Sequence, residues 1–327
     1  MILFLIAFAL LFILTGFLFV RTYLKEVNSV EAFKLPNSTE TVFFGDSHAL
    51  TSFNPEIIPL SFNASKNSES YFQTYYKFVS ILNSNPQIKN VVLSYSYHNI
   101  SIAGNQNVLY GDKYYFLLDE IGKKTIHTAR NGQLLKFRYG TTYNCIKQLH
   151  ANLSHFAISN FLWLKYDIGL PVDANKYTEF FVTLLENDPQ LKLHPIFEDI
   201  YKSTHSNLVA SVINKAIERH FYYRNEISAS EIMIEYLFKM AELCHTNEIN
   251  LILINTPLHP LYQSSIPEYY TDLHSNVLAD LLNMYDNIKY FDFTSVNYPD
   301  SLFGDGDHLN AFGMTRFSEE IKDIFNE

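Results

Sequence analysis

The chain has little of several features that mark common functional classes. Its 327 residues include two cysteines and one tryptophan, and only 18% of the residues are charged. Cys145 and Cys244 show neither CxxC nor another metal-type spacing, and they are compatible either with a disulfide or with two buried thiols. The formal net charge is -10 and no Lys/Arg-rich stretch is present, which argues against a nucleic-acid partner.

Motifs for cofactors are also missing. Neither GxGxxG nor GxxxxGK[ST] occurs, so the sequence predicts no nucleotide cofactor. No HExxH or other close ligand spacing occurs among the histidines between residues 101 and 227, so we expect neither a metal nor a diffusible cofactor. These histidines include His127, His150, His155, His194, His205 and His220.

Hydrophobic residues make up 47% of the chain, enough to bury one large core or two modest ones. The aromatic share is high, with 23 Tyr and 27 Phe. Tyr-rich runs at residues 114–116 and 221–223 are compatible with a core or with a sugar-binding surface, and we interpret most of them as core.

The N-terminus carries a long apolar run. No charged side chain occurs between Met1 and Val20. As a helix this run spans roughly 30 Å, the thickness of a bilayer core. We therefore predict that residues 1–21 form a transmembrane anchor. A cleaved signal sequence is the alternative, although the run exceeds a usual h-region and no A-x-A-like site follows it.

Beyond residue 35, short apolar runs alternate with amphipathic stretches, a pattern typical of βα units around a mainly parallel sheet. We therefore predict an α/β fold. The expected strands are residues 41–44, 60–64, 89–95, 249–255 and 289–293.

Three helices are expected between and after these strands. In residues 71–82 one face carries Phe72, Tyr75, Tyr76, Val79 and Leu82. A second helix is expected at residues 230–245, with Ser228 and Glu231 at capping-box spacing. The last helix carries an apolar stripe formed by Met314, Phe317, Ile321, Ile324 and Phe325.

The pattern changes between about residues 101 and 227. Few clean strands occur there, and Tyr- and Leu-rich helical stretches dominate. No low-complexity linker separates this region from the rest, so we interpret it as a mostly helical insertion carried by the α/β core.

Two polar motifs lie at opposite ends of the expected core. Gly45-Asp46-Ser47-His48 directly follows the apolar residues 42–44, which places a serine at the end of a predicted strand. Asp305 precedes His308 by three residues, just before the last helix. Serine, aspartate and histidine are the residue types that nucleophilic catalysis uses. Taken singly, each motif is also compatible with an ordinary turn or helix cap.

Together the two motifs resemble the SGNH hydrolase superfamily, also called GDSL esterases. The resemblance covers residues 38–100 and 249–325 and leaves the middle unassigned. It implies one three-layer α/β/α domain over residues 38–327, SGNH or flavodoxin-like, with the insertion at about 101–227. Gly45 and Asp46 would support the motif around the nucleophile.

The resemblance implies a catalytic triad. Ser47 would be the nucleophile, His308 would accept its proton, and Asp305 would orient the imidazole. Asp307 is a competing carboxylate, but family members carry the acid three residues before the histidine.

The oxyanion donors follow the family pattern less well. The Ser47 backbone N–H is one expected donor. The glycine of the family's second block is absent, and Asn67 or Ser68 is expected in its place. For the third block Asn99 is the nearest amide, with Ser96 as a rival. This drift resembles membrane-tethered members linked to O-acylation of polysaccharides. His48 fits that group, and it is also compatible with an exposed turn.

The expected function is that of an ester hydrolase or O-acyltransferase working through an acyl-Ser47 intermediate. The expected substrate is a short acyl ester on a cell-envelope glycan or a small ester, and a membrane-bound acyl-donor partner is compatible with the anchor. The alternative is a membrane-anchored, non-catalytic glycan-binding or scaffold protein. We expect an extracytoplasmic domain, although Arg21, Lys25 and Lys34 follow the anchor and by themselves favour the cytoplasm.

Overall fold

The structure is a computed structural model that describes residues 33–105, 121–122, 210–223 and 225–325. The chain divides into two compact units, one of residues 1–33 and 115–184 and the other of residues 34–114 and 185–327. Only residues 33, 121 and 122 of the first unit are described. The account below therefore concerns the second unit.

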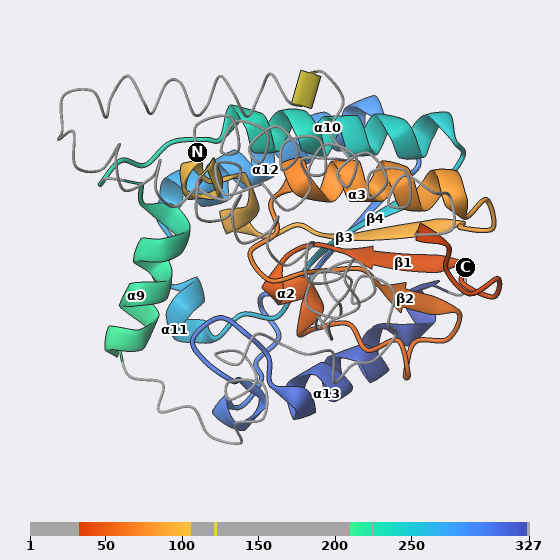
Figure 1. The fold of residues 1–327 in the computed structure, drawn as a ribbon. Helices are drawn as coiled ribbons and strands as arrows, with labels where there is room; N and C mark the ends of the chain where they lie inside the picture. The colour runs from red at the N-terminus through yellow and green to blue at the C-terminus, as the bar shows by residue number, and fades with distance from the viewer. Residues whose placement is uncertain (1–32, 106–120, 123–209, 224, 326–327) are drawn as a thin grey trace, which may run out of the picture. The chain divides into compact units, whose positions relative to one another are not determined.

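Five strands form one sheet within the described residues, and every pairing is parallel (Figure 1). The expectation of a mainly parallel α/β sheet is confirmed, and each strand lies within two residues of its predicted bounds. The strands are β1 (Thr41–Phe44), β2 (Ser61–Asn63), β3 (Asn90–Ser94), β4 (Asn250–Asn255) and β5 (Ile288–Asp292).

The order of the strands across the sheet is β2-β1-β3-β4-β5. Strand β2 therefore pairs with one edge of β1. Strand β3 pairs with the other edge, and β4 and β5 extend the sheet from β3. In open parallel sheets ligands bind in the crevice beyond the carboxyl ends of the strands, where the strand order reverses. The sheet thus places that crevice at the ends of β1 and β3.

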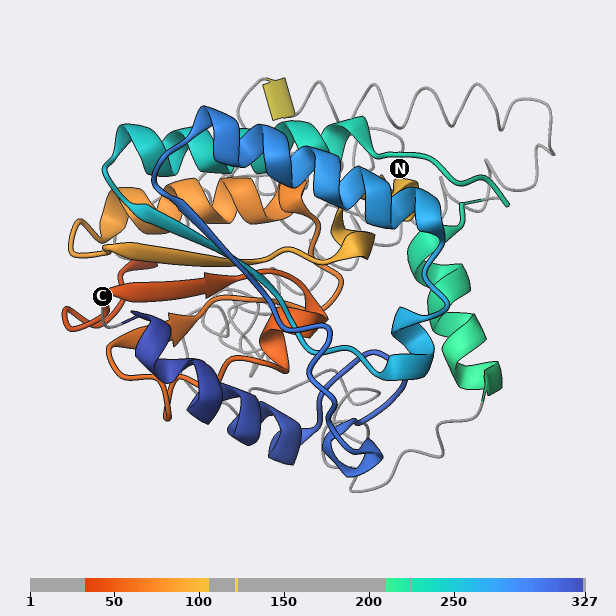
Figure 2. The same cartoon turned by 180° about the vertical axis from the view of Figure 1, so that it is seen from behind.

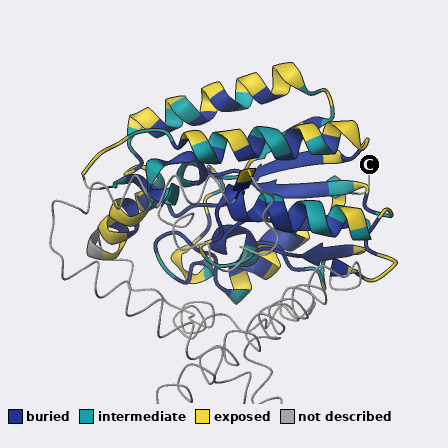
Figure 3. Cartoon of the chain, turned by 45° about the horizontal axis from the view of Figure 1, so that its top comes forward, coloured by how far each residue is buried: buried dark blue, intermediate teal, exposed yellow. Residues whose placement is uncertain are grey.

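Helices cover both faces of the sheet (Figures 1 and 2). On one face lie α3 (Tyr71–Ser84), α10 (Glu231–Thr246) and α12 (Glu268–Met284), and on the other lies α13 (Ala311–Ile321). Figure 3 shows buried strands between helices whose outer sides are exposed. Strands covered on both faces need near-continuous apolar sequences, which explains the run TVFF in β1.

Helix α3 buries only part of the face that its apolar residues predict, with Phe72 and Tyr76 buried as expected. Tyr75, Val79 and Leu82 are only half-buried, whereas Thr74 and Lys77 are fully buried. The buried Lys77 ammonium pairs with the Glu69 carboxylate at 2.6 Å, which satisfies a charge that the helix could not otherwise bury. The apolar pattern missed this face because one of its members is a paired lysine.

The N-terminus of α10 is capped by Ser230, and the expected cap at Ser228 is wrong. The Ser230 hydroxyl accepts a hydrogen bond from the Met233 N–H at 3.2 Å. Ser228 lies two residues before this cap, where its carbonyl accepts a bond from Ile102 N at 3.0 Å. At the other end of the chain the predicted stripe packs as expected, with Phe317 and Ile321 fully buried in the core.

Short elements connect the strands and helices. They are α2 (Ser47–Leu50), η2 (Tyr97–Ile100), η3 (Ile102–Gly104), α9 (Ala210–Phe221), α11 (Pro260–Gln263), η5 (Asp300–Leu302) and η6 (Lys322–Phe325). Helix α9 falls inside the predicted insertion, most of which lies outside the described residues.

Two expectations concern residues that the structure does not describe. No helix among the described residues has the length and hydropathy of a membrane span, and the predicted anchor at residues 1–21 lies outside them. Cys244 is a free, buried thiol, while Cys145 also lies outside the described part of the chain.

Candidate active site

The turn between β1 and α2 depends on Gly45. Its φ of 146° is one that residues with a side chain rarely adopt. A Cβ at this position would lie 2.8 Å from the Cβ atoms of both Ala49 and Ser94. Glycine therefore lets the chain turn sharply against β3 and deliver the next residues to the end of the sheet.

Asp46 fixes the start of α2. Its Oδ1 accepts a hydrogen bond from the His48 N–H at 3.0 Å, as an N-cap residue does. Its Oδ2 lies 2.6 Å from His98 Nε2 and accepts a bond from Asn99 Nδ2 at 2.9 Å. Asp46 thus ties the loop after β1 to the turn after β3, with Ser47 as the first residue of α2.

Asp305 folds the second motif back on itself. Its Oδ1 accepts bonds from the N–H groups of Asp307 at 3.0 Å and His308 at 2.8 Å. This local turn places His308 Nδ1 at 2.9 Å from Oδ1 and 3.0 Å from Oδ2 of Asp305. The three-residue spacing in the sequence therefore has a direct geometric reason.

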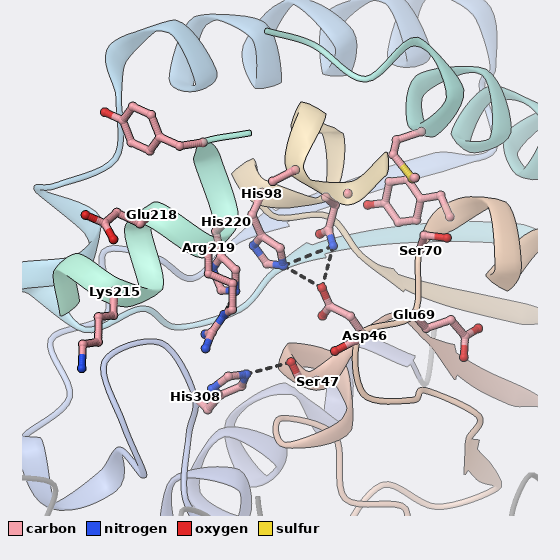
Figure 4. Close-up of a pocket in the computed structure, with 17 residues that line it drawn as sticks. Asp46, Ser47, Glu69, Ser70, His98, Lys215, Glu218, Arg219, His220 and His308 are labelled. Atoms are coloured by element: carbon pink, nitrogen blue, oxygen red, sulfur yellow. Dashed lines mark hydrogen bonds and ion pairs between the residues drawn. The ribbon is translucent and has the colours of Figure 1, made fainter. Parts of the chain in front are cut away.

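The two motifs meet across the end of the sheet. His308 Nε2 lies 2.8 Å from Ser47 Oγ, although 261 residues separate them in sequence (Figure 4). With the Asp305 contact at Nδ1, the proton of a neutral ring belongs on Nδ1, and Nε2 then accepts from the serine hydroxyl. The structure thus brings together the predicted Ser47, His308 and Asp305 in the order that nucleophile activation requires.

The competing carboxylate, Asp307, has a different set of neighbours. It lies farther from His308 Nδ1, at 3.5 Å. Its Oδ2 lies 3.2 Å from Arg219 Nη2, 3.3 Å from His48 Nε2 and 3.6 Å from His220 Nε2. Asp305 is therefore the carboxylate that orients His308, and Asp307 faces a second group of side chains.

The electrostatic environment separates the imidazoles. Burial lowers the pKa of His308, but the charges of Asp305 and Asp307 outweigh it and raise that pKa to about 9. Burial lowers the pKa of His48 and of His220, and in both cases nearby carboxylates do not compensate for it. The environment thus favours the charged form of His308 and the neutral forms of His48 and His220.

Asp46 and Asp307, two buried carboxylates beside the histidines, have lowered pKa values. Burial raises the pKa of Asp46, but the interaction with His98 outweighs it and holds the pKa below its usual range. Burial likewise raises the pKa of Asp307, but His308 and His220 outweigh it and hold that pKa well below its usual range.

A cavity of about 520 Å³ opens above Ser47 and His308. Figure 4 shows Arg219 and His220 reaching into it from α9, and His98 lying over Asp46. Its other lining residues come from the start of α3, from η2 and η3, and from α10. They include Ser70, Tyr71, Ala103, Gly104, Tyr222 and Met233.

The predicted oxyanion residues separate in the structure. Asn99 lines the cavity, but its Nδ2 already donates to Asp46 and its Oδ1 accepts from the Ser96 N–H at 2.7 Å. Ser68 also lines the cavity and is exposed, with a left-handed φ of 57°. Asn67 is not among the lining residues. The Ser47 N–H, as the first of α2, has no partner within that helix.

Three histidines form a group that the sequence did not indicate. One ring nitrogen from each of His48, His98 and His220 lies within 4.8 Å of the other two. The exposed turn that was the alternative for His48 is wrong, since only 1% of its surface is exposed. His48 and His98 each follow a predicted strand, which is a usable signal. Nothing in the sequence linked His220 to them.

Two groups of side chains have the composition of a metal site. The first is His48, His98 and His220, and the second is His48, Asp307 and His308. The second group includes the histidine that contacts Ser47, whereas the first leaves that histidine in place.

Comparisons with known proteins give three findings. A protein-family model that carries no functional description matches residues 209–327. No curated protein matches the chain. Among solved structures, a GDSL-like lipase from Bacteroides thetaiotaomicron is similar at 10% identity, with a TM-score of 0.37, covering 92% of this chain and 97% of the lipase.

Proposed function

We propose that the chain is an SGNH-type serine ester hydrolase or O-acyltransferase with Ser47 as its nucleophile. The observation that carries the proposal is the line of contacts from Ser47 Oγ through His308 to Asp305, at 2.8 and 2.9 Å, beneath an open cavity. Nucleophile, base and orienting acid within hydrogen-bond reach are the signature of this chemistry.

The residues imply the following steps. Ser47 Oγ attacks the ester carbonyl carbon while His308 Nε2 takes its proton. The bond to the alcohol oxygen then breaks, and His308 returns the proton to the departing alcohol, leaving an acyl-Ser47 ester. Water or a second hydroxyl attacks that ester, gives its proton to His308, and releases Ser47. Asp305 stabilises the imidazolium that forms in each half.

The oxyanion of each tetrahedral intermediate needs donors, each worth roughly 3 to 4 kcal/mol. The Ser47 N–H is one, and the Asn99 amide, whose Nδ2 also lies 3.4 Å from His98 Nε2, is the second within the cavity. Asp46 fixes that amide through its 2.9 Å bond. Asn99 thus takes the place that the resemblance gives to the third family block.

We further propose a short acyl ester on a cell-envelope glycan as the substrate. The support is the predicted anchor at residues 1–21 and the resemblance to membrane-tethered members that act on polysaccharides. An extracytoplasmic active site belongs to the same proposal. A protease-protection experiment on membrane vesicles tests it, because a cytoplasmic body would remove envelope glycans as substrates.

A second candidate function is a non-catalytic glycan-binding protein on the same frame. The observation that favours it is the engagement of Asn99, whose amide is bound on both sides by Asp46 and Ser96. A protein of this kind would bind its ligand in the cavity without an activated serine.

Labelling with a fluorophosphonate separates the two candidates, because this probe reacts only with an activated serine. We expect the wild type to be labelled, Ser47→Ala to lose all labelling, and His308→Ala to lose most of it. Ser275→Ala, which removes an exposed hydroxyl on α12, is the control and keeps full labelling. A folded wild-type protein that takes no label refutes the enzyme.

A further inference from the structure

We propose that His48, His98 and His220 form a binding site for a divalent transition-metal ion of the Zn²⁺ class. The three imidazoles come from α2, η2 and α9, and we call them the histidine cluster. Ser47 is not part of this site, so the proposal does not depend on the serine chemistry proposed above.

The rings of the histidine cluster converge. Their centroids lie 4.4 Å apart for His48 and His98, 4.6 Å for His98 and His220, and 5.7 Å for His48 and His220. One nitrogen of each lies within 4.8 Å of the others. Zn–N bonds of about 2.1 Å in a tetrahedral site require nitrogens about 3.4 Å apart. Small side-chain rotations therefore suffice for three of them to bind one ion.

Two of the rings have a hydrogen-bonded oxygen partner, and the third lies close to a carboxylate. His98 Nε2 lies 2.6 Å from Asp46 Oδ2, and His220 Nδ1 lies 2.6 Å from the Tyr262 hydroxyl. His48 Nε2 lies 3.3 Å from Asp307 Oδ2. Metal-binding histidines use such partners to fix the ring and the tautomer. The second nitrogen of His220, Nε2, accepts a hydrogen bond from Arg219 Nε at 3.3 Å, and a bound ion would replace this donor.

His48 supplies an independent observation. Its side chain is 1% exposed, yet neither ring nitrogen has a hydrogen-bond partner among the described residues. The Asp307 contact at 3.3 Å lacks hydrogen-bond geometry. Buried polar atoms are rarely left without a partner, because burial removes their hydrogen bonds to water. A metal ion bound at one of these nitrogens satisfies it.

The donor set points to a class of ion. Imidazole nitrogens suit Zn²⁺, Cu²⁺ and Ni²⁺ and disfavour Mg²⁺ and Ca²⁺, which prefer oxygen. Arg219 already bonds Asp307 at 3.2 Å, so this carboxylate is better placed as a partner of His48 than as a ligand. His98 and His220 line the cavity, which leaves an open fourth position facing the substrate space.

The first experiment measures binding of Zn²⁺ alone. The full chain, purified in detergent without a polyhistidine tag, is freed of metal with a chelator and titrated by calorimetry. Co²⁺ titration gives a second readout, because tetrahedral Co²⁺ has a strong visible absorption band. We expect one equivalent of each ion per chain.

Histidine variants identify the residues that bind this one equivalent of metal ion. His98→Gln and His220→Gln are expected to abolish the one-to-one binding and the Co²⁺ band. His245→Gln is the control, because His245 is an exposed histidine at the end of α10 outside the cluster. Circular dichroism on every variant verifies that the fold is retained.

Tyr262→Phe tests the arrangement more finely. It removes only the hydroxyl that holds His220 Nδ1, and the loss of such a partner weakens metal binding about 10- to 100-fold. Tyr270→Phe is the matched control, since this tyrosine is buried in the same apolar cluster but bonds the Phe221 carbonyl at 2.9 Å. It is expected to leave the affinity unchanged.

Two results overturn the proposal. One is a folded wild type that binds neither Zn²⁺ nor Co²⁺ saturably, and the other is binding that survives both His98→Gln and His220→Gln. Fluorophosphonate labelling of the metal-free chain is measured in parallel. If Ser47 is labelled while no metal binds, the metal site fails and the serine chemistry stands.

Discussion

Two groups of side chains share the cavity, and they are assembled in different ways. The proposed catalytic line of Ser47, His308 and Asp305 consists of two local motifs, each shaped by its own turn. The histidine cluster draws one residue from each of three elements. The comparison shows that a site made of local motifs is visible in a sequence, whereas a site made of single residues is not.

The two groups also differ in charge, although the His48 and His308 rings lie only 4.8 Å apart. Asp305 contacts His308 directly and, with Asp307, overcomes the effect of burial on its pKa. Burial dominates the pKa of His48, which moves the other way. The carboxylates around His308 therefore favour its charged form, whereas burial favours the neutral form of His48.

The largest expected effect separates the two carboxylates. Asp305→Asn removes the charge that orients His308, and we expect kcat for a small ester to fall about 10⁴-fold. Asp307→Asn changes the partner of His48 and Arg219, and we expect kcat to stay within about tenfold of wild type because the triad contact remains. Equal losses of kcat in the two variants would show that the catalytic line and the histidine cluster act as one unit.

The next effect concerns the oxyanion. Asn99→Ala removes the proposed side-chain donor, and we expect kcat to fall about 10²- to 10³-fold with little change in KM. Ser68→Ala, at an exposed residue of the same cavity, is expected to reduce kcat less than about tenfold. If the larger loss follows Ser68→Ala, the donor has been assigned to the wrong residue.

The pH dependence reports on His308. A general base must be unprotonated, and the pKa of His308 is raised to about 9. In chelator-containing buffer kcat/KM should therefore rise about tenfold per pH unit from pH 7 and level off near pH 9. A profile that levels off near pH 6 would contradict this. Because the shift is upward, protonated His308 stabilises the fold below about pH 6.5, and that contribution is lost as pH rises through 9.

The last prediction concerns the stability of the turn at Gly45. Gly45→Ala forces a side chain into a strained backbone and between Ala49 and Ser94, and should lower the free energy of unfolding by about 1–3 kcal/mol. Gly104→Ala is the control. Its Cβ would meet Met233 Cγ at 3.5 Å, an ordinary contact, so thermal unfolding should be nearly unchanged.

Much of the fold was predictable because parallel strands buried on both faces must be apolar throughout. The runs at residues 41–44 and 249–255 carry this signal directly. The cap of α10 was misplaced because Ser228 and Ser230 both precede a helix-forming run, and only hydrogen bonding distinguishes them. Apolar periodicity did not predict the burial of Lys77, because that burial depends on an ion pair with Glu69, which lies outside α3.

The candidate site also contains some residues that the sequence predicted and others that it did not. Asp305 and His308 are three residues apart, so their contact follows from one turn. His220 lies against His98 although the two are far apart in the sequence, and no spacing rule predicts that contact. Asn99 lines the cavity although its position in the sequence differs from that of the third block of the SGNH pattern. The turn η2 directs its side chain toward Asp46.

The reversal of strand order between β1 and β3 has a consequence for protein engineering. Ser47 and Asn99 are carried by the ends of neighbouring strands, whose spacing the sheet fixes, while Lys215, Arg219 and His220 are carried by one helix. Redesigning α9 is therefore a way to change which molecules enter the cavity, while the residues of the proposed ester chemistry stay in register with the sheet.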